Sequence, residues 1–221
     1  ILAGLMLYGI KLMSSPKTAP LGNALGAGAM LAAVIVTLVA EGIVSTPVIW
    51  AGLAAGTALG YVVASKVLMI QMPQMVALLN GLGGGASALV GLIIAFQGET
   101  SGSFAAFTTS LTILVGGLTF SGSAVAAGKL HGVIKQRPVE LPSHSTIVTI
   151  TALLAGVTLL LAGSIWAAVL QLVIALVIGV LLTVRVGGAD MPITISLLNS
   201  FSGFAGAVAG FPLQNPLLVA V

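Results

Sequence analysis

Long apolar stretches, separated by short polar or proline-containing breaks, make up almost the whole chain. A helix needs about 20 apolar residues to cross the hydrocarbon core of a bilayer, and most of the stretches approach that length. They predict transmembrane helices at Ile1–Met13, Gly22–Ala40, Val48–Ala64, Pro73–Phe96, Phe104–Gly128, Thr146–Ala162, Ile165–Val184, Met191–Phe211 and Leu217–Val221. The pattern therefore predicts an all-α integral membrane protein, a bundle of about eight or nine helices forming a single transmembrane domain over residues 1–221.

Both terminal stretches are too short to span a bilayer by themselves. We expect Ile1–Met13 to be the end of a first helix and Leu217–Val221 to be the beginning of a ninth. The sequence is therefore expected to be an excerpt of a longer chain.

The composition of the chain agrees with a membrane location. Of its 221 residues, 58% are hydrophobic and only 5% are charged, and the mean hydropathy is +1.24. A soluble domain usually carries about 25% charged residues. The net charge of +3 is therefore no indication of nucleic-acid binding. The absence of cysteine excludes disulfides and thiolate chemistry within the chain, and the positions of both histidines outside the apolar stretches argue against a haem.

The charged residues alternate between successive loops. All the cations fall in odd-numbered loops, at Lys11, Lys17, Lys66, Lys129, Lys135, Arg137 and Arg185, whereas the even-numbered loops hold Glu41, Glu99 or no charge. The positive-inside rule then places the odd-numbered loops in the cytoplasm. The longest loop, Lys129–Ser145, is either an anchor of this kind or a docking surface for a soluble partner.

Polar residues at membrane depth form faces on two of the predicted helices. One face holds Asn80, Gly84, Ser87 and Gly91, and the other holds Ser196, Asn199, Gly203, Ala207 and Gly210. An asparagine amide needs several hydrogen-bond partners, so the two asparagines favour a hydrated cavity over interhelical hydrogen bonds alone. Asn80, Asn199, Ser87 and Ser196 are therefore candidates for a proton path. No predicted span holds a titratable side chain, so the proton carrier would lie at the rim or on another chain.

Asp190 is the candidate at the rim. It precedes Met191 and Pro192, which is typical of a helix N-cap. Asp190 is either a cap paired with Arg185 or a group through which protons enter or leave.

Small residues at four-residue spacing predict close helix packing at Gly52, Gly56 and Gly60, and also at Gly84 and Gly203. The glycine-rich segment Gly81–Ala86 has the shape of a dinucleotide fingerprint, but no strand precedes it and it lies inside a span. We therefore expect no nucleotide site and no metal site in this chain.

Four segments resemble the membrane domain of the beta subunit of bacterial proton-translocating NAD(P) transhydrogenase. They are Gly9–Pro16, Met72–Gly81, Ser121–Leu130 and the segment from Gly187 to Pro192 that continues into Leu198–Gly203. The resemblance implies the membrane part of an enzyme that couples hydride transfer between NAD(H) and NADP(H) to proton translocation. It also implies a homodimer of alpha–beta units in the bacterial inner membrane.

The nucleotides would bind outside this chain, one in a domain of the alpha subunit and one in a domain that follows the last membrane helix of beta. Asn199 matches an asparagine implicated in the proton path, and Asp190 matches an acidic residue near the NADP(H)-binding domain. Asn80 departs from the best-known members, which have histidine there. Other members have asparagine there and a histidine on a membrane helix of the alpha subunit. From the residues alone, a transporter or channel for a small neutral solute, or a passive anchor for a redox complex, stays open.

Overall fold

The computed structural model describes residues 1–40, 42–98, 102–215 and 218–219, and all the regular elements in this part of the chain are helices. Within it, six helices are long and apolar enough to cross a membrane. The all-α membrane fold is therefore confirmed. Glu41, Glu99 and most of the expected ninth helix, Leu217–Val221, lie outside the described residues.

The helices lie close to their predicted positions. They are α1 (Leu2–Met13), α2 (Ala19–Ala40), α3 (Pro47–Lys66), α4 (Met72–Gln97), α5 (Ser103–His131), α6 (His144–Leu160), α7 (Ile165–Val184) and α8 (Met191–Ala209). Three short 3-10 turns, η1 (Ile43–Ser45), η2 (Met69–Gln71) and η3 (Gly188–Asp190), join some of them.

Local sequence explains the helix ends. Proline occupies the first turn of α3, α4 and α8, where its missing N–H leaves no hydrogen bond unmade. Helix α5 continues past its predicted end at Gly128 and stops at Gly132, whose φ of +85° is readily adopted only by glycine.

The chain divides into two compact units, residues 1–67 and 68–221, which are described separately. In the first unit α1 packs against α2, where a Cβ atom on Gly9 would lie 2.9 Å from the carbonyl oxygen of Gly22. Helix α3 has no buried residue, and a Cβ atom on Gly52, Gly56 or Gly60 would meet no atom of another element within 4 Å. The described residues therefore do not supply the close packing expected at these three glycines.

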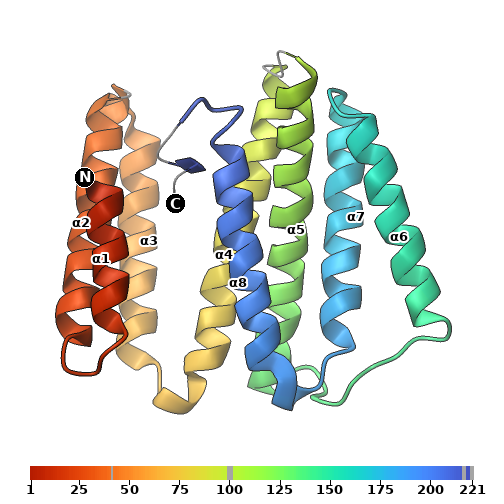
Figure 1. Cartoon of the computed structure of the whole chain (residues 1–221), viewed down its shortest axis with the longest axis horizontal. Coiled ribbons are helices and arrows are strands. Elements are labelled where there is room, and N and C mark those ends of the chain that lie inside the picture. The colour runs from red at the N-terminus through yellow and green to blue at the C-terminus, as the bar shows by residue number, and fades with distance from the viewer. Residues whose placement is uncertain (41, 99–101, 216–217, 220–221) are drawn as a thin grey trace. The chain divides into compact units, whose positions relative to one another are not determined.

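In the second unit α5 is the central helix. It packs against α4, α7 and α8, and α6 packs mainly against α7 (Figure 1). Fifteen of the residues of α5 are buried, and they include hydroxyl-bearing as well as apolar side chains. The core of this unit therefore surrounds α5 on several sides.

The backbones of α4 and α5 touch at two glycines. A Cβ atom on Gly116 would lie 2.6 Å from the carbonyl oxygen of Gly84 and 2.7 Å from the backbone nitrogen of Ala88. A Cβ atom on Gly84 would in turn lie 2.9 Å from the carbonyl oxygen of Gly116. Backbone atoms cannot move aside as a side chain can, so only glycine permits this separation of the two helices.

Replacing Gly116 by alanine should therefore force α4 and α5 apart. We expect Gly116→Ala to destabilise the protein by about 1–3 kcal/mol, the usual effect of overpacking a well-packed interior. The measurement is thermal unfolding of the purified protein in detergent. Gly28→Ala, at an exposed glycine of α2 with open space around it, is the matched control and should be neutral or slightly stabilising. Equal melting temperatures for the two variants would contradict the packing of α4 on α5.

Candidate functional site

Asn80 lies in the interface between α4 and α5, where its side chain is only 7% exposed. Its Nδ2 atom donates a hydrogen bond to Oγ of Ser123 at 3.1 Å. The two groups meet because α4 presents a glycine beside them: a Cβ atom on Gly81 would lie 3.1 Å from Cβ of Ser123. The close approach of the helices therefore brings an amide and a hydroxyl together inside an apolar bundle.

The second polar atom of the Asn80 amide is buried without a partner. Within the described residues no group donates a hydrogen bond to its Oδ1 atom. Exchanging the amide oxygen and nitrogen would only transfer the vacancy to the nitrogen, so one atom is unsatisfied in either orientation. A buried unpaired polar atom costs about 1–3 kcal/mol. The amide therefore has free hydrogen-bonding capacity, which suits a water molecule or a polar group of another chain.

Asn199 lies on the exposed face of α8, not in the interface that buries Asn80. Ser196 and Gly203 share this face and are exposed as well, and a Cβ atom on Gly203 would meet no atom of another element within 4 Å. The opposite face of α8 is buried, at Met191, Ile195, Leu198, Ala205 and Val208. The described residues therefore place the two asparagines on different surfaces, one covered and one open, and their part in a proton path stays a prediction.

Two other candidate residues make local contacts. Ser87 is half-buried, and its hydroxyl donates to the carbonyl oxygen of Gly83, one turn earlier in α4, at 3.2 Å. Asp190 is exposed and occupies the N-cap position of α8, with no hydrogen bond from its side chain to the helix. The suggested pairing of Asp190 with Arg185 is wrong, because Arg185 pairs with Glu140 at 3.0 Å. The carboxylate of Asp190 therefore neither pairs with this arginine nor accepts a hydrogen bond from the first turn of α8.

Lys129, near the end of α5, is a residue whose environment the sequence did not reveal. Its side chain is fully buried, and its Nζ atom donates to the carbonyl oxygens of Arg137 at 3.3 Å, of Val186 at 2.7 Å and of Val184. Loop cations of a membrane protein normally face the aqueous phase, so the positive-inside rule counted Lys129 as an anchor. One feature of the sequence could have indicated that Lys129 is buried. It directly follows the small residues Ala126, Ala127 and Gly128, which allow a neighbouring helix to approach.

The end of α7 is held by several groups from other segments. His144 Nε2 lies 3.0 Å from the carbonyl oxygen of Leu181, and the backbone N–H of Val139 donates to that of Val184 at 3.1 Å. The last carbonyls of a helix have no partner within the helix, so these contacts satisfy them. Together with Lys129 they join the α5–α6 loop to the turn between α7 and α8.

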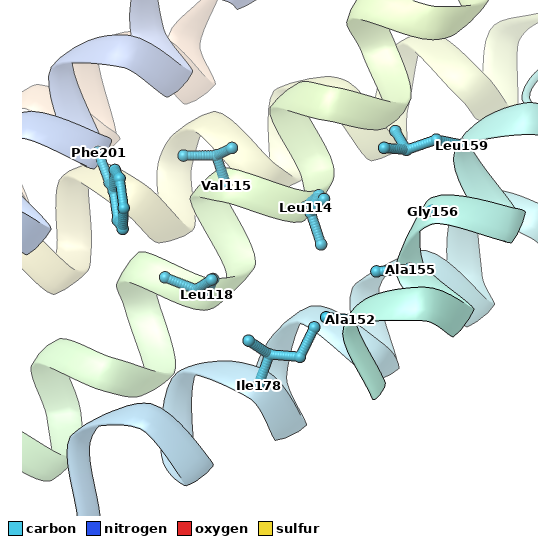
Figure 2. A pocket seen from close by; sticks show the side chains of 9 residues that line it. All are labelled: Leu114, Val115, Leu118, Ala152, Ala155, Gly156, Leu159, Ile178 and Phe201. Carbon is cyan, nitrogen blue, oxygen red and sulfur yellow. The ribbon is translucent and has the colours of Figure 1, made fainter. Parts of the chain in front are cut away.

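A separate pocket of about 300 Å³ lies among α5, α6 and α7, with Phe201 of α8 at one side (Figure 2). Leu114 and Leu118 of α5, Ala155 of α6 and Ile178 of α7 are among its lining residues, all of which are apolar or glycine. The pocket therefore offers no side chain that could order water.

Comparison with known proteins shows the family of this chain. The model of the family described as NAD(P) transhydrogenase beta subunit matches residues 1–221, the whole of the chain. The chain belongs to this family.

Two curated relatives support the assignment to the NAD(P) transhydrogenase beta subunit family. Both are named NAD(P) transhydrogenase subunit beta, one from Rhodospirillum rubrum and one from a particular strain of that species. Each is 38% identical to the chain over 231 residues, which cover 99% of the chain and 50% of the relative. The chain thus spans about half the length of these relatives.

The segments that carried the resemblance to the transhydrogenase family occupy defined places in the structure. Met72–Gly81 forms the first part of α4 and contains Asn80. Ser121–Leu130 is the part of α5 that contains Ser123 and Lys129. The segment from Gly187 onward forms η3 and the start of α8, which carries Asp190 and Asn199. Two of these segments therefore meet in the hydrogen bond between Asn80 and Ser123.

A double-mutant cycle on Asn80 and Ser123 should detect the hydrogen bond between them. We expect Asn80→Leu and Ser123→Ala to show a coupling energy of about 0.5–1.5 kcal/mol, the range of interhelical hydrogen bonds in membranes. The measurement is unfolding of the purified single and double variants in detergent. A cycle of Asn80→Leu with Ser87→Ala is the matched control and should show no coupling, since Ser87 bonds within its own helix. Additive effects of Asn80→Leu and Ser123→Ala would contradict the contact.

Proposed function

We propose that this chain is the proton-conducting membrane part of an NAD(P) transhydrogenase and couples proton translocation to hydride transfer between NAD(H) and NADP(H). The chain carries no nucleotide site in this proposal, because both nucleotides bind in soluble domains outside it. The observation that carries the proposal is the buried amide of Asn80, which bonds to Ser123 and keeps one polar atom unsatisfied inside a membrane bundle. This atom and the neighbouring Ser123 hydroxyl together offer polar partners to a water molecule at a depth where lipid offers none.

Asn80 orients water in this mechanism but does not carry the proton. A neutral amide does not titrate near neutral pH, whereas histidine does. The carrier is therefore a histidine on a membrane helix of the alpha subunit. The exposed face of α8 supports such a partner, because Ser196 and Asn199 are polar and Gly203 leaves room for a closely packed helix.

The joined loops provide the route from the proton path to the nucleotide domain. Lys129 and the backbone bonds at the end of α7 tie the α5–α6 loop to the turn before α8, where Asp190 is exposed. Docking of the NADP(H)-binding domain on this surface would respond to the protonation state of the path. By linkage, docking would change the proton affinity of the path to the same extent. The driving free energy is about 2.3 kcal/mol per proton for each 100 mV of membrane potential.

This proposal implies the membrane, the oligomeric state and the orientation of the complete enzyme. The chain works in a bacterial inner membrane as part of a homodimer of alpha–beta units, with its odd-numbered loops in the cytoplasm. A transporter of a small neutral solute could use the same polar groups, but it would need no nucleotide domain. The proposal is therefore tested by assaying proton movement and hydride exchange together.

Replacing Asn199 by leucine should remove proton coupling and leave membrane insertion intact. We expect Asn199→Leu to abolish proton-coupled turnover, because leucine cannot hold water beside the partner helix. The measurement is hydride exchange together with acidification of vesicles that contain the reconstituted alpha–beta complex.

Phe204→Leu is the matched control, because Phe204 is also exposed on α8 but is apolar. It should keep coupling close to that of the wild-type enzyme. Wild-type coupling in Asn199→Leu would remove Asn199 from the mechanism. Solute transport by vesicles that carry out no hydride exchange would favour the transporter.

A further inference from the structure

We propose that Lys129 is a positioning residue whose buried positive charge sets the proton affinity of the path beside Asn80 and Ser123. This inference rests on the proposed function and goes beyond it, since it assigns control of the path to a residue outside the polar faces. The residue ties α5 to the end of α7, and its ammonium group lies inside the protein instead of in the aqueous phase.

The contacts of Lys129 fit the charged form of its amino group. An ammonium group has three N–H donors, and three backbone carbonyl oxygens accept from Nζ. A neutral amine would have two donors and would turn its lone pair towards one of these oxygens. The carbonyl of Val184 is the last of α7, where the helix dipole favours a cation, and that of Val186 lies two residues beyond it.

The charge is close enough to the Asn80 site to act on it. Ser123 lies six residues before Lys129 in α5, which separates the two positions by about 9 Å along the helix axis. The intervening level is filled by Ala77, Ala126 and Met191, all with 0% exposure. A packed apolar interior screens the charge weakly, so an excess proton in the path beside Asn80 and Ser123 is repelled.

Other charged groups around Lys129 do not cancel this effect. Helix α4 carries no charged residue, and α8 carries none after its N-cap. His144 on α6 is buried, and its Nε2 atom contacts a backbone carbonyl. The remaining charged or titratable groups on the surrounding segments are all exposed, namely His131, Lys135, Arg137, Glu140, Arg185 and Asp190. Salt screens exposed charges much more strongly than a buried one.

Removing the charge should make the path easier to protonate. In Lys129→Met, the part of the pH profile that depends on protonation of the alpha subunit's histidine should move to higher pH by up to about one unit, the effect of a unit charge about 10 Å away. The measurement is proton-coupled hydride exchange of the reconstituted alpha–beta complex as a function of pH, at low and at high salt. The position of the profile is the readout, because a purely structural loss would lower the activity without moving it.

Three variants complete the test. Lys129→Arg keeps the charge and should keep the wild-type profile, whereas Lys129→Gln should behave like Lys129→Met. Lys135→Met removes an exposed cation of the same loop and should give a small shift that disappears at high salt. If Lys129→Met or Lys129→Gln still couples proton movement to hydride exchange but has the wild-type pH profile, the inference is overturned and the proposed function stands. Hydride exchange without proton movement in the wild-type enzyme would overturn the proposed function and the inference with it.

Both neutral variants leave buried carbonyls unpaired and so risk failing to assemble. In that case Gln136→Glu supplies the test with Lys129 intact, because the side chain of Gln136 lies beside Gly188 at the edge of the carbonyl cluster. The added negative charge should move the profile to higher pH at low salt, by less than one unit. Movement to lower pH, or no movement at a salt concentration at which Lys135→Met does move the profile, would overturn the inference.

Discussion

The contact between Gly84 and Gly116 sets the geometry on which the rest of the second unit depends. In a bilayer no hydrophobic force drives one apolar helix against another, so packing and hydrogen bonds must hold them together. With no side chain at either glycine, the backbones of α4 and α5 touch. Asn80 then reaches Ser123 at the same interface. At a wider separation of the helices the amide would meet lipid or another chain in place of this hydroxyl.

The end of α7 shows the same requirement at the edge of the bundle. Its last carbonyls have no partner within the helix, and at this depth they need partners from the protein. Lys129, His144 and the backbone of Val139 supply them from three different segments. Because Lys129 satisfies some of these carbonyls, its positive charge lies in the interior. The same contacts link the α5–α6 loop to the turn between α7 and α8.

The sequence predicted the helices well because the length of an apolar stretch and the breaks around it are local properties. It also placed Asn80 and Gly84 on one helix face, since helical periodicity is local too. It could not say which faces meet. The face with Asn199 is equally polar and equally regular, yet Ser196, Asn199 and Gly203 on it are exposed. Two of the three partners of Lys129, and the partner of Arg185, lie 45 or more residues away in the chain. Nothing in the local pattern separates such a lysine from an exposed anchor.

The difference between the two polar faces bears on how a path could form. Asn80 already has a partner in Ser123 and one unsatisfied atom, whereas Asn199 is exposed among the described residues. A polar face at membrane depth is stable only against protein or water. A helix from another chain that covers α8 would enclose Asn199 and could supply a titratable group beside it, where α8 itself has none. On this argument the path is a property of the assembled complex. In the proposed enzyme, the chain would contribute the water-ordering amides and the fixed charge, and the partner would contribute the proton carrier.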